Sequence, residues 1–452
     1  MSLEFIADEL ARLKQSDLFR EFQTIEGGQS EVLRTSRGEA LNLCSNNYLG
    51  LAGRPELADA AAAALRDFGS GAGASRLVSG HMSLHGELER RIAEFEGTES
   101  ALVFPTGYMA NLGAVTSLMG KEDVVFGDRL NHASLIDGCR LSGATFRAFR
   151  HRDLGSLEDA LKRASNFRRR MIATDGLFSM DGDVADMKGL AELADRYDAI
   201  TLVDEAHATG VIGASGRGVC EALDVEDRVD VRVGTLSKAV GCLGGFVAGS
   251  RDLIDLLRNR ARTFIFTTGL PPAICASAIA AFDIIQREPD LRARLCENAV
   301  LFRERLTEAL AETGGQANLE ASESEPDGKT PPHRAKMPEC LLDVRAFRRN
   351  SDLSPLPEAS STLESAIVTP IIPIIFGEAE EALRVAGELL EAGILIPAIR
   401  PPTVPNGTSR LRASVMATHT EEQLTDAARA VGNVCRFQRD HGRLPQSRST
   451  RS

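Results

Sequence analysis

The sequence predicts an α/β protein with a large domain on a mostly parallel sheet, followed by a smaller α+β domain. Three observations predict this architecture. The chain has 452 residues, two to three times the usual length of one domain. Short apolar runs alternate with segments of helical periodicity over residues 100–249, which is typical of a parallel sheet covered on both faces. A second, shorter series of apolar runs follows residue 366.

Six apolar runs predict the buried strands of the large sheet: Ala101–Phe104, Val124–Phe126, Met171–Thr174, Ile200–Asp204, Val231–Thr235 and Gly245–Ala248. Three segments between them have helical spacing: Tyr108–Met119, Ser134–Ser142 and Met187–Tyr197. In sheets of this kind ligands bind beyond the carboxyl ends of the strands, so we expect the functional site there.

The second half of the chain begins with Pro271 and Pro272, after which helical patterning continues through Thr313. The small domain is then predicted from Ile367–Phe376, Ala382–Ala392, Ile394–Ile399, Arg410–Val415 and Glu421–Phe437. The predicted divisions are an N-terminal arm (1–45), a large domain (46–285), a small domain (286–440) and a disordered tail (441–452). A surface insertion rich in Glu, Ser, Pro and Gly is expected at about 314–364, within which Cys340–Phe347 could form a strand.

The composition is that of a soluble globular protein, with 43% hydrophobic and 26% charged residues. Lys and Arg total 52 against 64 Asp and Glu, and the net charge of −12 works against binding nucleic acid or an anionic membrane. No apolar run approaches the ~20 residues that cross a bilayer. The eight cysteines are scattered without metal-ligand spacing, and Glu4, Asp8 and Glu9 do not suit a targeting peptide. We therefore expect reduced thiols, no metal, no membrane partner and a cytoplasmic location.

Two strand ends carry residues of the kinds found in catalytic or cofactor-binding sites. Asp204 ends an apolar strand three residues before His207, a pattern that an Asp capping a helix beside an incidental His would also give. The next strand ends at Thr235 and is followed by Ser237 and Lys238, and a lone lysine there is usually a surface charge. Together the two strand ends indicate a site, because carboxyl ends of parallel strands share one edge of a sheet.

A carboxylate, a lysine and hydroxyl groups at one sheet edge suit pyridoxal 5′-phosphate. Its aldehyde bonds a lysine amine, and its ring nitrogen needs an anionic partner. A phosphate favours a helix N-terminus, where free N–H groups and the helix dipole attract an anion. Phe104–Asn111 supplies such a strand-to-helix turn, with Thr235 as a further donor, although an ordinary β–α connection would look the same in isolation.

These segments resemble the α-oxoamine synthases, a family of fold-type-I pyridoxal-phosphate enzymes. The matching blocks are Leu43–Leu51, Gly71–Gly80 with His85, Asp128–Ser134, Asp175–Asp183, Val203–Gly210 and Thr235–Lys238. The resemblance runs from about Leu41 to Pro272 and resumes near Ile399. It implies a seven-stranded, mostly parallel sheet in the large domain and a homodimer with shared active sites.

The resemblance also implies roles for individual residues. Lys238 would bond the cofactor aldehyde and then move a proton, Asp204 would pair with the ring nitrogen, and His132 would stack on the ring. The implied catalytic residues are Lys238, His132, Asp204 and His207. The implied cofactor-binding residues are Gly107, Tyr108, His132, Ser179, Asp204, His207, Thr235, Lys238, Thr267 and Thr268, the last two reaching the phosphate from a partner subunit. The implied substrate-binding residues are Arg20, Asn46, His132, Thr403 and Arg412.

Within the family, Ala398–Arg412 is most similar to the branch that condenses L-alanine with a pimeloyl thioester in biotin biosynthesis. The acyl donor would be pimeloyl-carrier protein or pimeloyl-CoA. The alternatives are sister acyltransferases that include glycine C-acetyltransferase, 5-aminolevulinate synthase and serine palmitoyltransferase. Asp175, where some members of the branch have Glu, and the Cys242–Leu243 pair within a glycine-rich run depart from the pattern. A non-catalytic partner subunit is disfavoured because such members typically lack the lysine, and a nicotinamide dehydrogenase because no strand-to-helix GxGxxG is present.

Overall fold

The computed structural model describes residues 3–312 and 367–441. These residues form two compact units. The large unit contains residues 46–296 and 367–369, and the small unit contains residues 3–45, 297–312 and 370–441. The expected insertion at about 314–364, the possible strand at Cys340–Phe347 within it and the tail beyond His441 lie outside the described residues.

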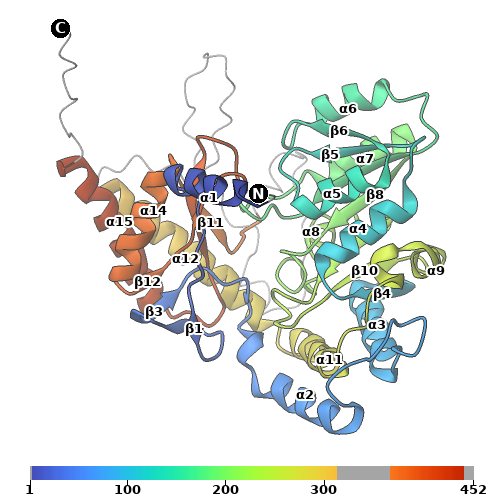
Figure 1. Ribbon diagram of the computed structural model, residues 1–452, viewed down its shortest axis with the longest axis horizontal. Helices are drawn as coiled ribbons and strands as arrows, with labels where there is room; N and C mark the ends of the chain where they lie inside the picture. The colour runs from blue at the N-terminus through green and yellow to red at the C-terminus, as the bar shows by residue number, and fades with distance from the viewer. Residues whose placement is uncertain (1–2, 313–366, 442–452) are drawn as a thin grey trace, which may run out of the picture. The chain divides into compact units, whose positions relative to one another are not determined.

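The large unit is built on a seven-stranded sheet with the order β4-β10-β9-β8-β7-β5-β6 (Figure 1). Its strands are β4 (Ser100–Phe104), β5 (Val124–Asp128), β6 (Thr145–Phe149), β7 (Arg170–Asp175), β8 (Ala199–Asp204), β9 (Val231–Thr235) and β10 (Gly245–Gly249). Strands β6, β5, β7, β8 and β9 pair in parallel, whereas β10 is antiparallel to both of its neighbours. The predicted mostly parallel sheet is confirmed.

Six of these strands match the runs predicted from the sequence, and β6 was missed. Strand β6 lies at the edge of the sheet, where only Phe149 is fully buried and Thr145 is exposed. Such a strand needs no continuous apolar run, unlike β5, whose five residues are all buried. The apolar pattern of the sequence therefore does not identify β6 as a strand.

Helices cover the sheet of the large unit (Figure 1). They are α2 (Pro55–Phe68), α3 (Ser83–Glu96), α4 (Gly107–Leu118), α5 (Ala133–Ser142), α6 (Leu154–Lys162), α7 (Met187–Tyr197), α8 (Val219–Ala222), α9 (Arg251–Arg260), α10 (Arg262–Ile265) and α11 (Pro272–Arg287). Helix α7 has the predicted bounds because Asp186 caps its first turn by accepting the N–H of Gly189. Its buried face carries Leu190 and Leu193.

The core of the large unit lies between the sheet and the helices that follow the strands. Phe104 and Val233 from the sheet pack in one buried cluster with Val115 of α4 and Leu135 of α5. This cluster anchors the N-terminal ends of α4 and α5 near the carboxyl ends of the strands, which is where the sequence places the site.

The small unit contains two sheets, β1-β2-β3-β12 and β11-β14-β13. Its elements are α1 (Phe5–Gln15), β1 (Ile25–Glu26), β2 (Val32–Thr35), β3 (Gly38–Asn42), β11 (Ile371–Gly377), α14 (Ala379–Glu391), β12 (Ile394–Leu395), β13 (Ala398–Ile399), β14 (Ser409–Ser414) and α15 (Glu421–His441), with α12 (Asp290–Glu312) contributing its residues from 297 onward. The predicted segment Ile394–Ile399 forms two short strands, one in each sheet. Pro397 falls between the pieces and has no N–H to donate to a ladder. In residues 3–312 and 367–441 no helix is both long and apolar enough to cross a membrane.

Candidate active site

Two acidic residues meet at the carboxyl edge of the large sheet. Asp175 at the end of β7 lies in register with Asp204 at the end of β8, and Asp204 lies in register with Val233 of β9. Strand β9 ends two residues later at Thr235, and Lys238 follows three residues beyond. The segments that carry the predicted acid and the predicted lysine are therefore neighbours in the sheet.

The Asp204 carboxylate is buried and held by two donors. Its Oδ1 accepts the backbone N–H of Ala206 at 2.9 Å, and its Oδ2 accepts the Asn111 side-chain amide at 2.6 Å. The same amide reaches Ser134 Oγ at 2.9 Å, and Ser134 Oγ lies 2.7 Å from His132 Nδ1. A polar chain thus connects the predicted acid to the predicted ring-stacking histidine. Sequence reasoning missed Asn111 and Ser134 as members of it.

Lys238 lies within electrostatic reach of His132 and Asp175. Its positive charge contributes to lowering the pKa of both groups. For His132 the pKa is lowered overall, first because surrounding protein atoms desolvate the ring, while the Asp204 carboxylate opposes this change. The structure therefore brings together Lys238, His132 and Asp204, three of the four predicted catalytic residues.

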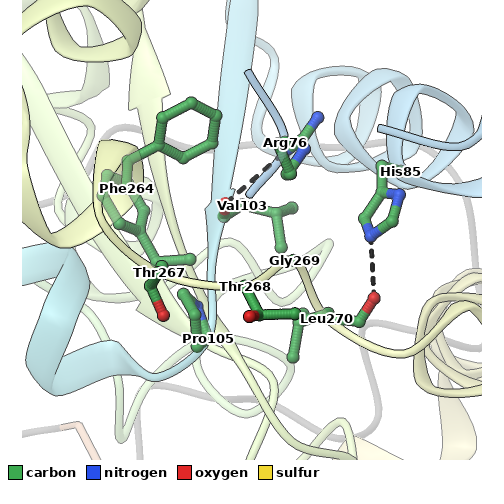
Figure 2. A pocket seen from close by; sticks show the side chains of 10 residues that line it. Arg76, His85, Val103, Pro105, Phe264, Thr267, Thr268, Gly269 and Leu270 are labelled. Carbon is green, nitrogen blue, oxygen red and sulfur yellow. Dashed lines mark hydrogen bonds between the residues drawn. The ribbon is translucent and has the colours of Figure 1, made fainter. Parts of the chain in front are cut away.

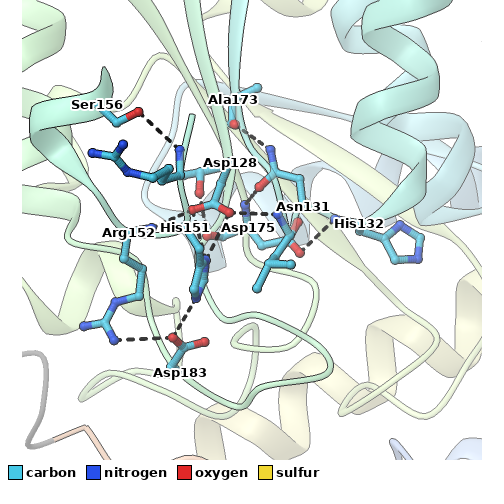
Figure 3. A network of polar contacts seen from close by, with 12 residues as sticks. Asp128, Asn131, His132, His151, Arg152, Ser156, Ala173, Asp175 and Asp183 are labelled. Atoms are coloured by element: carbon cyan, nitrogen blue, oxygen red, sulfur yellow. Dashed lines mark hydrogen bonds and ion pairs between the residues drawn. The ribbon is translucent and has the colours of Figure 1, made fainter. Parts of the chain in front are cut away.

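Asp175 is the second buried carboxyl group of this edge. Burial raises its pKa well above the usual range, the charge of Asp204 adds to the effect, and Lys238 opposes it. Its Oδ2 accepts the backbone N–H of His132 at 3.1 Å, and Asn131 links the same turn to β7 (Figure 3). Asp175 therefore positions His132, and its surroundings disfavour a negative charge on its carboxyl group.

His207, the fourth predicted catalytic residue, is buried and paired with a tyrosine. Its Nδ1 lies 2.7 Å from the Tyr48 hydroxyl, and that hydroxyl donates to Asn46 Oδ1 at 3.2 Å. The predicted substrate residue Asn46 is thus connected to the predicted cofactor residue His207. Tyr48, fully buried, is the link that the sequence-based assignment of roles left out. Ser179 is buried in the loop after β7.

The predicted phosphate site lies where α4 begins. The hydroxyl of Thr106 caps the helix by accepting the N–H of Met109 at 3.1 Å. A Cβ at Gly107 would lie 3.2 Å from Thr235 Oγ1, and a Cβ at Gly245 would lie 2.4 Å from Gly107, so the backbones approach closely here. Glycines leave the helix N-terminus accessible to an anion.

Two neighbours refine this assignment. Thr235 is buried, and its hydroxyl contacts the Gly244 carbonyl at 2.9 Å and Ser237 Oγ at 2.7 Å. Ser237 is exposed, which makes its hydroxyl the more accessible of the pair, although the sequence-based set contained only Thr235. Tyr108 is partly exposed and donates its hydroxyl to Asp137, with its ring edge-on to His132 at a centroid distance of 6.4 Å.

Thr267 and Thr268 line a narrow cleft in the large unit (Figure 2). Arg76, which forms a bidentate ion pair with Glu89, and Pro105 of the turn before α4 line the same cleft. The proposed reach of the two threonines into a partner's phosphate site stays a prediction.

Arg20, Thr403 and Arg412 all belong to the small unit. Arg412 on β14 is buried, and its Nη1 donates to Ser414 Oγ at 2.8 Å. Arg20 and Thr403 line a cavity of about 700 Å³ together with Arg400 and Ile399. The two residues predicted to contact the acyl substrate therefore share one cavity, and Arg412 lies elsewhere on the same unit.

The residues present fit pyridoxal 5′-phosphate. A buried carboxylate held by two donors, a half-buried lysine near it, and a helix N-terminus opened by glycine are the three features that the cofactor requires. The Oδ1 atom of Asp175 is buried without a hydrogen-bond partner among the described residues. This edge of the sheet therefore has a polar atom that a bound ligand could contact. Among these residues no cluster of His, Cys, Asp and Glu is arranged to hold a metal ion.

The model of the aminotransferase class I and II family matches residues 39–324 and 361–431. The chain belongs to this family. The seven-stranded, mostly parallel sheet and the site at its carboxyl edge are those of the fold-type-I enzymes. The expected fold class is confirmed.

Curated relatives point to one branch of this family. The 8-amino-7-oxononanoate synthase of Geobacter sulfurreducens is 43% identical over 431 residues, covering 95% of this chain and 97% of the relative. That of Geobacter metallireducens is 45% identical over 434 residues, with the same coverage. The expected resemblance to the α-oxoamine synthases, and to this branch of them, is confirmed.

Solved structures agree on the fold. A serine palmitoyltransferase from S. paucimobilis with a bound PLP–myriocin aldimine has a TM-score of 0.80 and 30% identity, covering 98% of both chains. The 8-amino-7-oxononanoate synthase of Francisella tularensis has a TM-score of 0.66 and 25% identity, covering 88% of this chain and 99% of that one.

Proposed function

We propose that this chain catalyses the decarboxylative condensation of L-alanine with a pimeloyl thioester in biotin biosynthesis. The products are 8-amino-7-oxononanoate, carbon dioxide and the free thiol carrier, and the acyl donor is pimeloyl-carrier protein or pimeloyl-CoA. The observation that carries the proposal is the 43 to 45% identity, over nearly the whole chain, to relatives named for this product.

A serine palmitoyltransferase is the second candidate, because such structures superpose with higher TM-scores than the oxononanoate synthase of F. tularensis. Their identity to this chain is only 30%, against 43 to 45% for the curated oxononanoate synthases. Backbone similarity is shared by all branches of a fold, whereas sequence identity follows the residues that select the substrate. The first candidate is therefore favoured.

The cofactor of this reaction is pyridoxal 5′-phosphate. When bound, it supplies an electron sink for the electrons released at the α-carbon of the amino acid. The N-terminus of α4 at Gly107 and Tyr108, with Thr235, would hold its phosphate, and Ser179 and His207 would hydrogen-bond its phenolic oxygen. His132 would stack on its ring.

Asp204 and Lys238 are the two protein side chains proposed to act directly on the cofactor. The Asp204 carboxylate would keep a proton on the ring nitrogen, and Asn111 and the Ala206 N–H hold that carboxylate in place. Lys238 would first bond the cofactor aldehyde and then, released by the substrate amine, take and return protons at the α-carbon through Nζ.

The substrate carboxylate must remain in place until the carbon–carbon bond has formed. Arg412 is suited to this task because its planar guanidinium matches a carboxylate with two hydrogen bonds. Asn46 would assist, supported by its hydrogen bond from Tyr48. Arg20 and Thr403 would contact the acyl chain, and the cavity that they share supports this role.

The active form is proposed to be a cytoplasmic homodimer. Three large apolar side chains of the large unit are exposed on segments next to Thr267 and Thr268: Leu77 at 50%, Val78 at 81% and Phe266 at 70%. A bridge between Ser75 and Thr268 holds these two segments side by side. Exposed apolar side chains gathered in this way are typical of a subunit interface. Sedimentation of the unchanged protein and of Val78→Glu tests it, and a fully active monomer would contradict it.

Product analysis tests the activity. The purified protein would be offered alanine, glycine or serine with acetyl, succinyl, pimeloyl and palmitoyl thioesters, and products identified by mass spectrometry. We expect 8-amino-7-oxononanoate from alanine and the pimeloyl thioester. A long-chain aminoketone from serine and the palmitoyl thioester would support the second candidate instead.

A further inference from the structure

His151 lies between three turns at the carboxyl edge of the large sheet (Figure 3). Its Nδ1 is 3.0 and 3.1 Å from the two oxygens of Asp128 at the end of β5, and its Nε2 is 2.9 Å from Asp183 Oδ2 in the loop after β7. His151 itself lies in the turn after β6 and its side chain is 13% exposed. The reaction described above assigns it no role.

Both ring nitrogens of His151 face carboxylate oxygens, which accept hydrogen bonds and do not donate them. A neutral imidazole has one donor and one acceptor nitrogen, so it can satisfy only one of the two carboxylates, whereas an imidazolium satisfies both. Burial lowers the pKa of His151, but the hydrogen bonds to Asp128 and Asp183 outweigh it and raise the pKa to about 9. The geometry and the electrostatics therefore agree on a charged ring at neutral pH.

The charges of the cluster balance when His151 is protonated. Asp128 and Asp183 supply two negative charges, and His151 and Arg152 supply two positive charges, with Arg152 Nη1 3.3 Å from Asp183. The Arg152 backbone N–H also donates to Asp128 at 2.9 Å. Loss of the His151 proton would leave one negative charge in excess around carboxylates that are largely shielded from water.

Asp128 shapes the turn that presents His132. Its side chain accepts the N–H of Leu130 at 2.8 Å, and its carbonyl accepts the N–H of Asn131 at 3.1 Å. Asn131 then bonds the backbone of β7 at Ala173 and Asp175, as Figure 3 shows. The position of His132 therefore depends on the turn that begins at Asp128.

Asp183 closes the loop that carries Ser179. Its carbonyl accepts the N–H of Phe178 at 2.9 Å, and the N–H of Gly182 donates to the Phe178 carbonyl at 3.0 Å. The Phe178 ring also packs edge-on against the His151 ring at a centroid distance of 4.5 Å. His151 thus contacts both ends of the loop in which Ser179 lies.

We propose that His151, as an imidazolium, is a positioning residue that fixes the turn presenting His132 to the loop presenting Ser179. The cofactor site keeps its shape only while this ring holds Asp128 and Asp183 together. The inference rests on the proposed function, because it takes His132 and Ser179 to be the residues that contact pyridoxal phosphate.

The first test uses the unchanged protein, so it does not depend on a variant that folds. Selective ¹⁵N labelling of histidine and nuclear magnetic resonance report the protonation of each ring nitrogen, and the His151 signals are assigned by their loss in His151→Gln or, if that variant does not fold, by their shift in Asp183→Asn. We expect both His151 nitrogens to carry protons at pH 7.5 and to titrate only well above pH 7. A ring that is neutral at pH 7.5 would overturn the proposal.

The second test compares His151→Gln with Arg150→Gln, a neighbouring control whose side chain is 64% exposed and outside the cluster. Amide hydrogen exchange in the cofactor-free protein should become faster by about tenfold or more in residues 129–132 and 177–184 of His151→Gln only. Unchanged exchange in both segments of the folded variant would refute the positioning role.

The third measurement separates positioning from a merely structural contribution. The dissociation constant for pyridoxal phosphate should rise about tenfold in His151→Gln at pH 7.5, as expected for one lost charge-assisted hydrogen bond. The ratio of the two constants should fall toward one near pH 10, because the unchanged protein then loses the same charge, and titration of Lys238 cancels in the ratio. A ratio that does not change with pH would contradict the proposal. None of the three tests uses alanine or a thioester, so failure to form 8-amino-7-oxononanoate would count against the proposed function alone.

Discussion

Asp175 and Asp204 lie opposite each other, in register, at the carboxyl ends of β7 and β8. Two buried carboxyl groups this close do not both ionise readily, and burial together with the Asp204 charge raises the pKa of Asp175. The Asp204 oxygens accept from the Asn111 amide and the Ala206 N–H, and the Asp175 Oδ2 accepts the His132 N–H. Asp175 thus contacts the turn that carries His132, whereas Asp204 contacts Asn111 of α4, so the two carboxyl groups have different tasks.

This difference predicts a large loss of turnover for one of two matched substitutions and a small loss for the other. Asp204→Asn removes the charge that would pair with the cofactor ring nitrogen, and we expect turnover to fall by at least about 100-fold. Burial and the Asp204 charge disfavour a charge on Asp175, and Asp175→Asn keeps an acceptor for the His132 N–H, so turnover should stay within about tenfold. Steady-state kinetics of both variants measures this, and equal losses would show that the charge is shared.

Asn111→Ala should weaken the site without touching the carboxylate itself. It removes the donor that lies 2.6 Å from Asp204 Oδ2 and leaves a buried charge short of a hydrogen bond. Such a loss costs about 1 to 3 kcal/mol, or roughly 10- to 100-fold in turnover or in the dissociation constant for pyridoxal phosphate. Asn259→Ala is the control, because that side chain is exposed and bonds only the backbone of its own helix. Equal values for both variants would remove Asn111 from the site.

Lys238→Ala should abolish turnover and the visible absorbance that develops when pyridoxal phosphate is added to the protein. The reason is that the proposed bond to the aldehyde and the proton transfer both use Lys238 Nζ. Absorbance spectra and product assays measure the two effects separately. Lys162→Ala, an exposed lysine on α6, serves as the control, and a Lys238→Ala protein with normal turnover would exclude the lysine from the chemistry.

Glu96→Gln should change how stability depends on pH. Burial raises the pKa of Glu96 from 4.5 to about 8, although the positive charge of Arg232 acts to lower it. Because the pKa is higher in the folded protein, the unchanged protein loses stability as pH rises from about 4.5 through 8, and the glutamine variant does not. The two proteins should unfold alike at pH 5, and the variant should be more stable on the order of 1 to 3 kcal/mol at pH 8.5.

Denaturant unfolding at the two pH values measures this difference. Glu94→Gln, on the exposed face of the same helix, is the control and should show no such dependence. A Glu96→Gln protein that is less stable than the unchanged protein at pH 8.5 would mean that the ion pair with Arg232 outweighs the cost of burial.

The buried strands and the residues at their ends were predictable from the sequence, because apolar runs and strand termini are local features. Strand β6 was not, since an edge strand is only half buried. Asn111 lies in the interior of α4 and His151 follows an edge strand, so neither stands where local pattern reveals chemistry. Their partners, Asp204 and Asp183, are distant in the sequence, and only the packing of α4 and of the turns after β6 and β7 brings them together.

Strand β10 has a consequence for how the protein is made. Among the described strands, β4 pairs in the sheet with β10 alone, and β10 also separates it from β9. A ribosome releases β4 long before β10, so the emerging chain exposes an unpaired apolar strand until residue 249 has left the exit tunnel. The helix that would cradle the phosphate follows β4 directly. Nascent chains that end before residue 249 therefore lack a complete cofactor site. They also expose an unpaired strand edge to which chaperones can bind.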